Sequence, residues 1–369
     1  MILNRKEVLG ALQLVYPGIS RKEDTDQSDC FAFRDGMVFT YNGGLSIKTN
    51  SGLPKEMIGA IKAQVFLDYF CKMKIEELDV EDKGDIFLVK GKGEWVKFVK
   101  ESKFQLPIKD VETPTLWKKL PEDFLDGLRM VQECAGSNEA EFATVCVHIH
   151  PNWLEAFDNF QMCRYTLKTG FENPTIIKRD FLKHILGFNV DQFSETDRWI
   201  HFRKKPDPKN SDQPELIVSC IKAVGDYPDI TEFAEGGDGW APMKMPEGLG
   251  EKVASASISS ASNVDYNHVK VVLDGEKKKV YVIGLGASSE YKGWKSIVYS
   301  GKQISFMISP KLLSGIVAKY EKCQITDGRL KVIGDNFVYC TCLSKVVEKD
   351  LDEEVKPKKK KKKLVKEGV

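Results

Sequence analysis

One ten-residue phrase occurs three times along the chain: "IKAQVFLDYF" begins at Ile61, "IKRDFLKHIL" at Ile177 and "ISPKLLSGIV" at Ile308. Each copy opens with Ile and carries apolar residues at its fifth, sixth, ninth and tenth positions. Apolar residues at this spacing lie on one side of an α-helix. A chain that repeats an amphipathic helix at long intervals is predicted to fold as tandem copies of one module.

A second apolar phrase recurs at matching intervals. Val8 begins "VLGAL", Phe124 begins "FLDGL" and Leu249 begins the looser "LGEKV". Phe124 follows Val8 by 116 residues, and Ile177 follows Ile61 by the same 116. Two unrelated phrases rarely agree at one offset by chance, so each copy of the module is expected to carry two helices. The third copy is spaced by 125 and 131 residues, which indicates a short insertion between its helices.

The segments between these helices are predicted to form β-hairpins. Asp-Gly stands between apolar or alternating runs in "CFAFRDGMVFTYN" (30–42), "VKVVLDGEKKKVYVIG" (269–284) and "CQITDGRLKVIG" (323–334). A tight hairpin turn needs positive φ, which Asp and Gly tolerate. Residues 78–91 and 199–221 are predicted hairpins with longer turns. Each copy therefore predicts helix, hairpins, helix and hairpin, an α+β module whose antiparallel sheet carries two helices on one side.

The apolar stripe of each helix is predicted to pack on the sheet and to leave the opposite side in solvent. In the second helix of the first copy this stripe comprises Ile61, Val65, Phe66, Tyr69, Phe70 and Met73.

Two turn-rich stretches, "VETPTLWKKLP" and "EGGDGWAPMKMPEG", separate the copies. They predict domains at 1–118, 119–242 and 243–347. Residues 348–369 carry nine Lys and six Asp or Glu. A run of like charges such as "KPKKKKKK" cannot bury itself, so this tail is expected to be disordered.

Composition narrows the class of protein. The 369 residues are 42% hydrophobic and 30% charged, a balance typical of soluble globular domains. The sequence lacks an apolar run long enough for a membrane span, and "MILNRKEVLG" lacks the apolar core of a signal peptide. Nine cysteines without a Cys-x-x-Cys pair indicate free thiols in a reducing compartment. We expect a cytoplasmic protein with no membrane partner.

The repeated stretches resemble a known family. They are "NRKEVLGALQLVYPGIS" and "FAFRDGMVFTYN" in the first copy, "EAFDNFQMCRYTL" and "CIKAVGDYPDI" in the second, and "YSGKQISFMISPKLLSGIV" and "CQITDGRLKVIGDNFVYCTCL" in the third. By their order and spacing, residues 1–345 are similar to the bacterial β-type DNA polymerase sliding clamp, the DNA polymerase III beta-subunit processivity factor. Clamp-like proteins of bacteriophages are the nearest in kind, which would place this chain in the cytoplasm of a host bacterium.

The resemblance implies three tandem clamp domains and a head-to-tail ring of two subunits, with helices inside and antiparallel sheets outside. Twelve helices about 10 Å across would leave a hole of roughly 28 Å, wider than a duplex of about 20 Å. Edge strands at the two ends of the chain would pair with the partner subunit. The implied function is to encircle duplex DNA without sequence specificity and to tether a DNA polymerase. The implied partners are double-stranded DNA, a polymerase, a clamp loader and a second copy of the chain.

Such a ring needs a basic inner face that attracts phosphates weakly enough to slide. The expected DNA-facing residues lie on the polar sides of the repeated helices. They are Arg5, Lys6, Lys62, Lys72, Arg129, Lys178, Arg179, Lys183, Lys252, Lys311, Lys319 and Lys322. A helical Lys is more often simply solvated. The first helix of the second copy also carries four acids, Glu122, Asp123, Asp126 and Glu133, so either these favour the positive end of the helix dipole or that helix contributes little.

The family also binds partner peptides in a pocket between its second and third domains. The positions that match this pocket are Asn159, Phe160, Gln161, Met162, Tyr227, Pro228, Tyr339 and Cys342. Here "DNFQMCRY" replaces the family's Asp-Gly-His-Arg-Leu, and a Lys-rich tail follows what is usually the last strand. Any of these aromatic residues could instead belong to the core.

No metal, cofactor or catalytic group is expected. Cys146, His148 and His150 alternate on one strand, but two imidazoles on a strand's solvent face explain the pattern, and no fourth ligand is evident. The sequence contains no phosphate-binding glycine loop, and no Cys is paired with a His and an orienting acid at a recognisable spacing. A hydrolase that uses a free thiol is therefore a remote alternative.

Two further questions stay open. The hexalysine at 358–363 could be a solubilising tail, an additional electrostatic hold on DNA or, least in keeping with three copies, a nuclear address. The alternative to a ring is a clamp-fold adaptor, a monomer or open chain that docks peptides without encircling DNA.

Overall fold

The computed structural model describes residues 2–91, 93–205, 215–236, 238–261 and 267–346. Contacts divide the chain into unit 1, which is Met1–Ala234 with Gly334–Tyr339, and unit 2, which is Glu235–Ile333 with Cys340–Val369. Unit 1 holds the first two predicted copies and unit 2 most of the third. The division into three domains stays a prediction, and the Lys-rich tail lies outside the described residues.

Unit 1 begins with strands and helices in the predicted alternation. The first copy contains β1 (Ile2–Asn4), α1 (Arg5–Val15), β2 (Cys30–Arg34), β3 (Met37–Tyr41), β4 (Leu45–Asn50), β5 (Gly59–Lys62), α2 (Ala63–Lys72), β6 (Glu77–Asp82), β7 (Ile86–Gly91), β8 (Glu94–Val99) and the 3₁₀ turn η2 (Ile108–Asp110). The second contains β9 (Lys118–Lys119), α3 (Phe124–Val131), η3 (Gln132–Cys134), β10 (Cys146–His150), β11 (Trp153–Phe157), β12 (Gln161–Thr166), β13 (Thr175–Lys178), α4 (Arg179–Phe188), β14 (Gln192–Glu195), β15 (Trp199–Lys204), β16 (Leu216–Ile221) and α5 (Thr231–Glu235).

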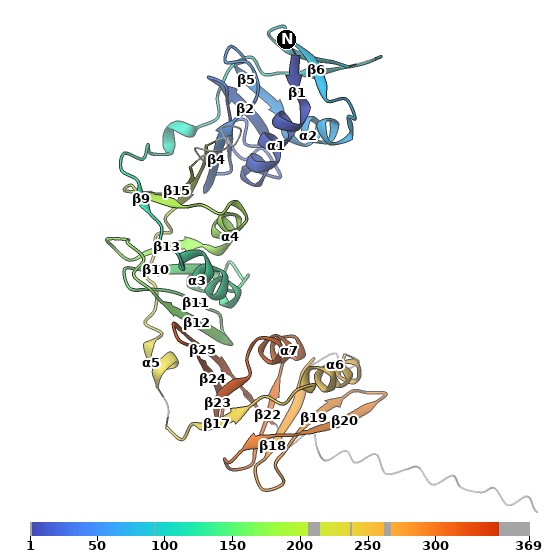
Figure 1. Cartoon of the computed structure of the whole chain (residues 1–369), viewed down its shortest axis with the longest axis vertical. Helices are drawn as coiled ribbons and strands as arrows, with labels where there is room; N and C mark the ends of the chain where they lie inside the picture. The colour runs from blue at the N-terminus through green and yellow to red at the C-terminus, as the bar shows by residue number, and fades with distance from the viewer. Residues whose placement is uncertain (1, 92, 206–214, 237, 262–266, 347–369) are drawn as a thin grey trace, which may run out of the picture. The chain divides into compact units, whose positions relative to one another are not determined.

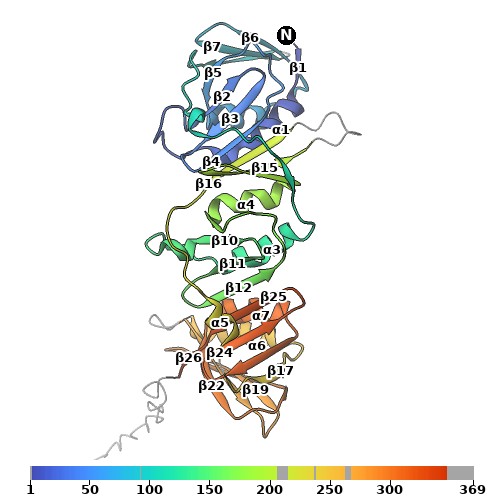
Figure 2. The same cartoon turned by 90° about the vertical axis from the view of Figure 1, so that its left-hand side faces the viewer.

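An eight-stranded antiparallel sheet joins the first two copies. Its order is β5-β2-β3-β4-β16-β15-β14-β9, so four strands come from each copy. The junction is the β4–β16 pair, in which Ser46 lies opposite Ser219. Figure 2 shows β4, β16 and β15 at this junction. The order β1-β6-β7-β8 forms a separate four-stranded sheet, and β13-β10-β11-β12 follow one another in a third.

Helices cover one face of the eight-stranded sheet. The ring of Phe66 on α2 packs against the rings of Phe31 and Phe33, with distances of 6.3 and 6.1 Å between ring centres. Thr40 Oγ1 donates a hydrogen bond to the carbonyl of Val15 at the end of α1, 2.7 Å away. Because successive side chains of a strand point to opposite faces, the residues between these lie on the face away from the helices. Contacts join α1 to α2 and α3 to α4, as two helices on one side of a sheet predict.

The repeated phrase spans the end of a strand and the start of a helix. Ile61 and Lys62 pair with Phe31 and Cys30 in the sheet, and α2 begins only at Ala63. The same transition occurs between β13 and α4. The prediction of a helix from its first residue is therefore wrong. The delayed start moves Val65 off the buried positions of α2, and its side chain is 62% exposed.

A connecting segment packs across the face of the sheet that the helices leave open. Phe104, Ile108 and Val111 contact a cluster that includes Phe39 and Trp199. The Trp199 indole donates to the carbonyl of Asp110, 3.0 Å away. Residues 104–111 thus bury apolar side chains against strands of both copies. These contacts hold the connecting segment on the sheet.

His201 lies fully buried on this same face. Its Nδ1 is 2.8 Å from Ser219 Oγ, and its Nε2 is 3.1 Å from Thr196 Oγ1. Because the Thr196 hydroxyl donates to the carbonyl of Trp199, it accepts from Nε2–H of His201. The Nδ1 atom then accepts from Ser219 in the neutral imidazole. Burial lowers the pKa of His201 to about 4.

This shift makes stability pH-dependent. The unfolded chain protonates His201 near its ordinary pKa, whereas the folded chain resists protonation, so the stabilisation is complete above pH 6.5 and falls as the pH drops toward 4. We expect a loss of about 3 kcal/mol over that window. Urea unfolding at a series of pH values should show it, and His201→Gln should remove that part of the slope. Parallel pH profiles for the two proteins would contradict the assignment.

Unit 2 repeats the arrangement with its own helices. It contains β17 (Ala241–Lys244), α6 (Leu249–Ser260), β18 (Val269–Asp274), β19 (Lys279–Leu285), β20 (Glu290–Ser296), β21 (Val298–Tyr299), β22 (Ile304–Ile308), α7 (Pro310–Lys319), β23 (Lys322–Thr326), β24 (Arg329–Ile333), β26 (Ser344–Lys345) and part of β25 (Phe337–Cys342). The order β20-β19-β18-β22-β26 forms one sheet, and β24-β23-β17-β21 are neighbours in another. Figure 1 shows α6 beside α7.

The close packing of α6 on its sheet depends on one glycine. A Cβ at Gly284 of β19 would collide with the carbonyl oxygen of Ala256 in α6. The absence of a side chain lets the helix backbone approach the strand directly, which explains the glycine in an otherwise apolar strand. Across the described ranges, the helices are all too short or too polar to span a membrane.

Candidate DNA-facing helices and peptide-binding surface

The expected DNA-facing residues of the first copy are largely engaged within the protein. Arg5 Nη1 donates to the carbonyl of Phe70, 2.6 Å away. Lys6 forms an ion pair with Glu76 at 2.6 Å. Lys72 is exposed at the last residue of α2.

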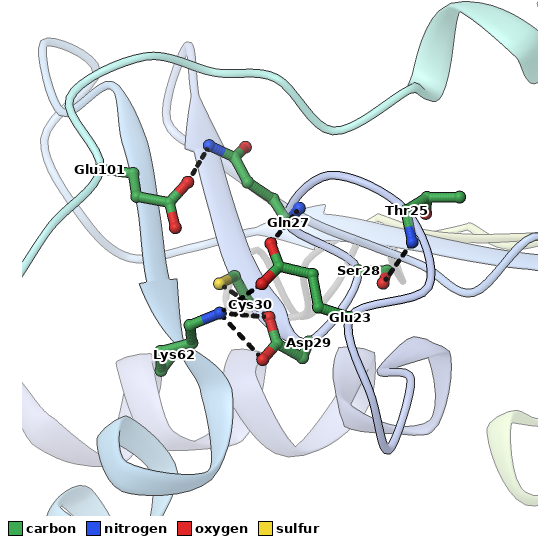
Figure 3. A network of polar contacts seen from close by, with 8 residues as sticks. All are labelled: Glu23, Thr25, Gln27, Ser28, Asp29, Cys30, Lys62 and Glu101. Carbon is green, nitrogen blue, oxygen red and sulfur yellow. Dashed lines mark hydrogen bonds and ion pairs between the residues drawn. The ribbon is translucent and has the colours of Figure 1, made fainter.

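Lys62 does not lie on a helix, contrary to the prediction. It is the last residue of β5, and its Nζ contacts both Asp29 oxygens at 2.9 Å and Glu23 Oε2 at 3.0 Å. Figure 3 shows these contacts beside the buried Gln27, whose amide donates to Glu101. Burial alone would lower the pKa of Lys62, but hydrogen bonds to the two carboxylates outweigh it and raise the pKa above its ordinary value. Lys62 therefore links the end of β5 to the loop that precedes β2.

Ion pairs recur in the second copy. Arg129 contacts Asp126 at 2.5 Å, one turn away on α3. Lys183 contacts Asp180 at 3.1 Å on α4. Arg179 Nη1 donates to the carbonyl of Ala135 at 2.8 Å, and Arg179 also lies 3.5 Å from Asp180.

One further residue of the second copy and one of the third lie on strands. Lys178 ends β13, so α4 starts one residue after it. Lys322 begins β23 and lies opposite Lys244 of β17. Both were expected on helices, and that placement is wrong because sheet pairing extends to these residues. Lys252 lies on α6, and Lys311 and Lys319 on α7.

The internal ion pairs leave the helices able to contact an anion. Exposed pairs such as Lys6–Glu76 contribute little to stability, because water and side-chain entropy offset the attraction. A lysine in such a pair can turn to a phosphate at small cost. The acids nevertheless remain close by, so the helix faces combine both signs of charge.

Seven of the eight predicted peptide-pocket residues lie in unit 1. Phe160 is 61% exposed at the β11–β12 turn. Asp158 closes this turn by accepting from the backbone N–H groups of Phe160 and Gln161, both at 2.8 Å. The hydroxyl of Tyr339 donates to Gln161 Oε1, 3.0 Å away. The exposed ring thus stands on a turn whose geometry is fixed.

The remaining predicted residues divide between surface and core. Asn159 donates to Glu141 at 2.7 Å, and Pro228 is exposed. Met162 is fully buried, so it belongs to the core, which corrects its assignment to the pocket lining. Strand alternation explains this, since Met162 points opposite to Gln161. Cys342 ends β25 in unit 2.

Tyr227 packs over a buried charge cluster that the prediction missed. Glu155 is 3% exposed and accepts from Arg164 Nε at 2.7 Å, while its other oxygen lies 2.7 Å from His148 Nδ1. Arg164 also donates to Thr231 at 3.1 Å. The Tyr227 ring lies 4.6 Å from the His148 ring. Burial opposes ionisation of Glu155, but bonds from His148 and Arg164 overcome it and lower its pKa.

The strand register contained the information needed to predict this cluster. His148, Glu155 and Arg164 occupy paired positions on three adjacent antiparallel strands, β10, β11 and β12. Had the registers been assigned, the three would have been placed side by side. Among the described residues, no group of three or more His, Cys, Asp or Glu side chains could hold a metal ion.

Two edge strands carry exposed tryptophans. β8 ends the four-stranded sheet of unit 1, and Trp95 and Val99 on it are 68% and 79% exposed. β20 ends the five-stranded sheet of unit 2, and Trp294 on it is 50% exposed. An open edge with large apolar side chains is a template for pairing with another strand.

Comparison with known proteins gives a consistent answer. The sequence matches no protein-family model and no curated protein. The structure matches the DNA polymerase III subunit beta of Pseudomonas aeruginosa, with a TM-score of 0.75, 12% identity and coverage of 94% of this chain and 100% of that chain. It also matches a sliding clamp from Bartonella birtlesii solved with griselimycin bound, with a TM-score of 0.78, 13% identity and coverage of 94% and 99%. The structure also matches the beta subunit from Streptococcus pyogenes, with a TM-score of 0.74, 15% identity and coverage of 94% of this chain and 99% of that chain.

The chain has the sliding-clamp fold. The predicted α+β class, with antiparallel sheets and repeated helices, is confirmed by this match. In these comparisons the matched region covers 94% of this chain and 99–100% of the solved clamp. At 12–15% identity, the likeness resides in element order and packing rather than in shared side chains.

Proposed function

We propose that this chain is a DNA sliding clamp, a replication processivity factor that encircles duplex DNA and tethers a DNA polymerase. The observation that supports it most is the match to sliding clamps over 94% of the chain. The role is mechanical and requires no catalytic residue. A ring linked to DNA by topology needs only weak contacts with phosphates, which it can exchange as it slides.

The proposed ring is a head-to-tail homodimer. The edge strand β8 of each subunit pairs with β20 of the other, which closes two identical interfaces. Each pairing removes two open edges, and it brings Trp95 and Val99 on one strand near Trp294 on the other. Apolar side chains that are exposed in the single chain would then cover one another.

The partners follow from the same proposal. The exposed Phe160 on the β11–β12 turn and the segment that carries Tyr227 and Pro228 are proposed to bind peptide segments of a polymerase and a clamp loader through apolar side chains. Arg164 and Thr231 hold the segment that carries Tyr227 against the sheet. We further propose a bacteriophage origin and action in the cytoplasm of the host bacterium.

Helix lysines supply the proposed contact with DNA. Lys72, Lys252 and Lys311 lie on three helices and make no ion pair with a described residue. Replacing all three by Gln should weaken binding to a random-sequence duplex. It should also reduce the slope of log affinity against log salt by up to about 0.9 per lysine. Titration of a fluorescent duplex at several salt concentrations measures both quantities.

The matched control is Lys168→Gln, an exposed lysine outside the helices, which should leave both values unchanged. Unchanged affinity and slope in the triple variant would contradict the proposed DNA face.

A further inference from the structure

A cavity of about 390 Å³ opens on the eight-stranded sheet, beside the segment that connects the first two copies. Its floor comes from β2, β3, β4, β15 and β16, and its wall from residues 108–114. All of these belong to unit 1. The volume falls within the range of small-molecule sites, roughly 300 to 1,000 Å³.

The cavity lies on the face of the sheet opposite the helices. Arg34, Phe39 and Lys48 line it, whereas their neighbours Phe33, Val38 and Ile47 point to the helix side and are buried. Any ligand there is remote from the helix faces proposed to contact DNA. A ligand site in this cavity therefore does not depend on the proposed function.

Positive charge exceeds negative charge in the lining. Arg34, Lys48 and Lys109 come from three different elements, and Glu112 is the one carboxylate. Glu112 Oε2 already accepts from the backbone N–H of Arg198 at 3.0 Å. This leaves an excess of two positive charges around one cavity.

The three cations have no strong internal partner. Lys48 is half-buried, and neither Lys48 nor Lys109 forms an ion pair with any residue in the described ranges. The nearest acid to Arg34 is Asp35, whose carboxylate is 3.8 Å away and largely exposed. The Arg34 guanidinium lies 4.4 Å from the centre of the Phe104 ring, which orients it. A half-buried lysine without a counterion favours an external anion.

The rest of the lining is both polar and apolar. Ser46, Ser219 and His201 form a row across three paired strands. His201 and Ser219 bond to each other and are buried, so they form the closed floor beneath the cavity. The apolar part of the lining comprises Phe39 and Ile217 on the floor and Ile108, Val111 and Pro114 on the wall. A ligand with an anionic group at one end and an apolar or planar body at the other matches this division.

We propose that this cavity binds a small phosphate monoester of the nucleoside monophosphate class. A phosphate monoester carries a charge of about −1.5 to −2 at pH 7, which matches the excess of two positive charges. Arg34 supplies a planar fork for two phosphate oxygens, and Lys48 and Lys109 act as point charges. The body of the ligand lies against Phe39 and Ile108. A bound ligand joins the sheet to residues 108–114 and so stiffens the connection between the first two copies.

Calorimetric titration of the full chain with three probes tests the proposal. Adenosine monophosphate should bind saturably with one site per chain, inorganic phosphate more weakly, and adenosine not at all over the same millimolar range. Lys48→Met and Lys109→Met should each lower the affinity for adenosine monophosphate at least tenfold, and Lys168→Met should not change it. Because Lys109 is exposed on the connecting segment, its loss leaves the sheet intact if Lys48→Met fails to fold.

Hydrogen exchange locates the site independently, since adenosine monophosphate should slow exchange in residues 108–114. Absence of saturable binding by either phosphate probe would overturn the proposal, as would equal binding of adenosine. Equal affinity for phosphate and adenosine monophosphate would overturn the assignment to an ester. If Lys48→Met and Lys109→Met both left the affinity for adenosine monophosphate unchanged, the ligand would bind elsewhere. That result would also overturn the proposal.

Discussion

Trp95→Asp should convert the protein from a particle of about twice 41.7 kDa to single chains. Trp95 is 68% exposed on the edge strand β8, and in the proposed ring it lies against the β20 edge of the partner subunit. A buried aromatic anchor replaced by a charge weakens one interface by about 3 kcal/mol, roughly a hundredfold. Because the ring contains two identical interfaces, the substitution acts twice. Light scattering at micromolar concentration measures the mass.

Trp294→Asp on β20 should have the same effect from the other side of the interface. A mixture of the two variants should recover the mass of two chains, because one of its two interfaces joins an intact β8 to an intact β20. That pair is an open dimer, held at one junction only. Recovery on mixing is specific to a head-to-tail arrangement, in which β8 of one chain pairs with β20 of the other. If β8 paired with β8, or β20 with β20, mixing the two variants would create no pair of intact strands that each variant lacks alone.

Val224→Asp is the matched control, because Val224 is 95% exposed and lies outside the edge strands. It should remain at the mass of two chains. The edge-strand account would be wrong if Trp95→Asp and Trp294→Asp each kept the mass of the unmodified protein, or if their mixture stayed monomeric.

Arg164→Met should destabilise unit 1 by about 3 to 5 kcal/mol. The change leaves the Glu155 carboxylate buried and removes the hydrogen bond that it accepts from Arg164 Nε at 2.7 Å. It also removes the contact with Thr231 and the stacking of the guanidinium 4.8 Å from the Trp153 ring. Urea unfolding followed by circular dichroism reports the loss of free energy.

The control pairs Arg164→Met with Glu155→Gln, which removes the buried charge together with its partner. This double variant should be more stable than Arg164→Met alone, because a neutral amide costs less to bury than an unpaired carboxylate. A double variant less stable than the single one would show that the charge of Glu155 is not what makes the arginine necessary.

Periodicity was sufficient to predict the alternation of helices and hairpins. The repeated phrases from Ile61, Ile177 and Ile308, together with the Asp-Gly turns, indicated helices and hairpins in the observed alternation. Element boundaries were less accessible. Ile61 has an apolar side chain that suits a strand or a helix equally, and only its pairing with Phe31 across the sheet decides between them.

The site residues depended more on tertiary contacts. A helical lysine such as Lys6 is visible in the sequence, but its partner Glu76 lies seventy residues away and becomes apparent only in the fold. The Glu155 cluster was missed for the same reason, since its members are joined by strand register. The cavity beside Lys48 is formed by strands of two copies and their connecting segment, an arrangement that no local pattern encodes.

Electron microscopy of the purified protein distinguishes a ring from a single chain. We expect closed particles of two chains with a central hole wide enough for a DNA duplex. Compact particles of one chain without a hole would contradict this expectation and would favour an adaptor that does not encircle DNA.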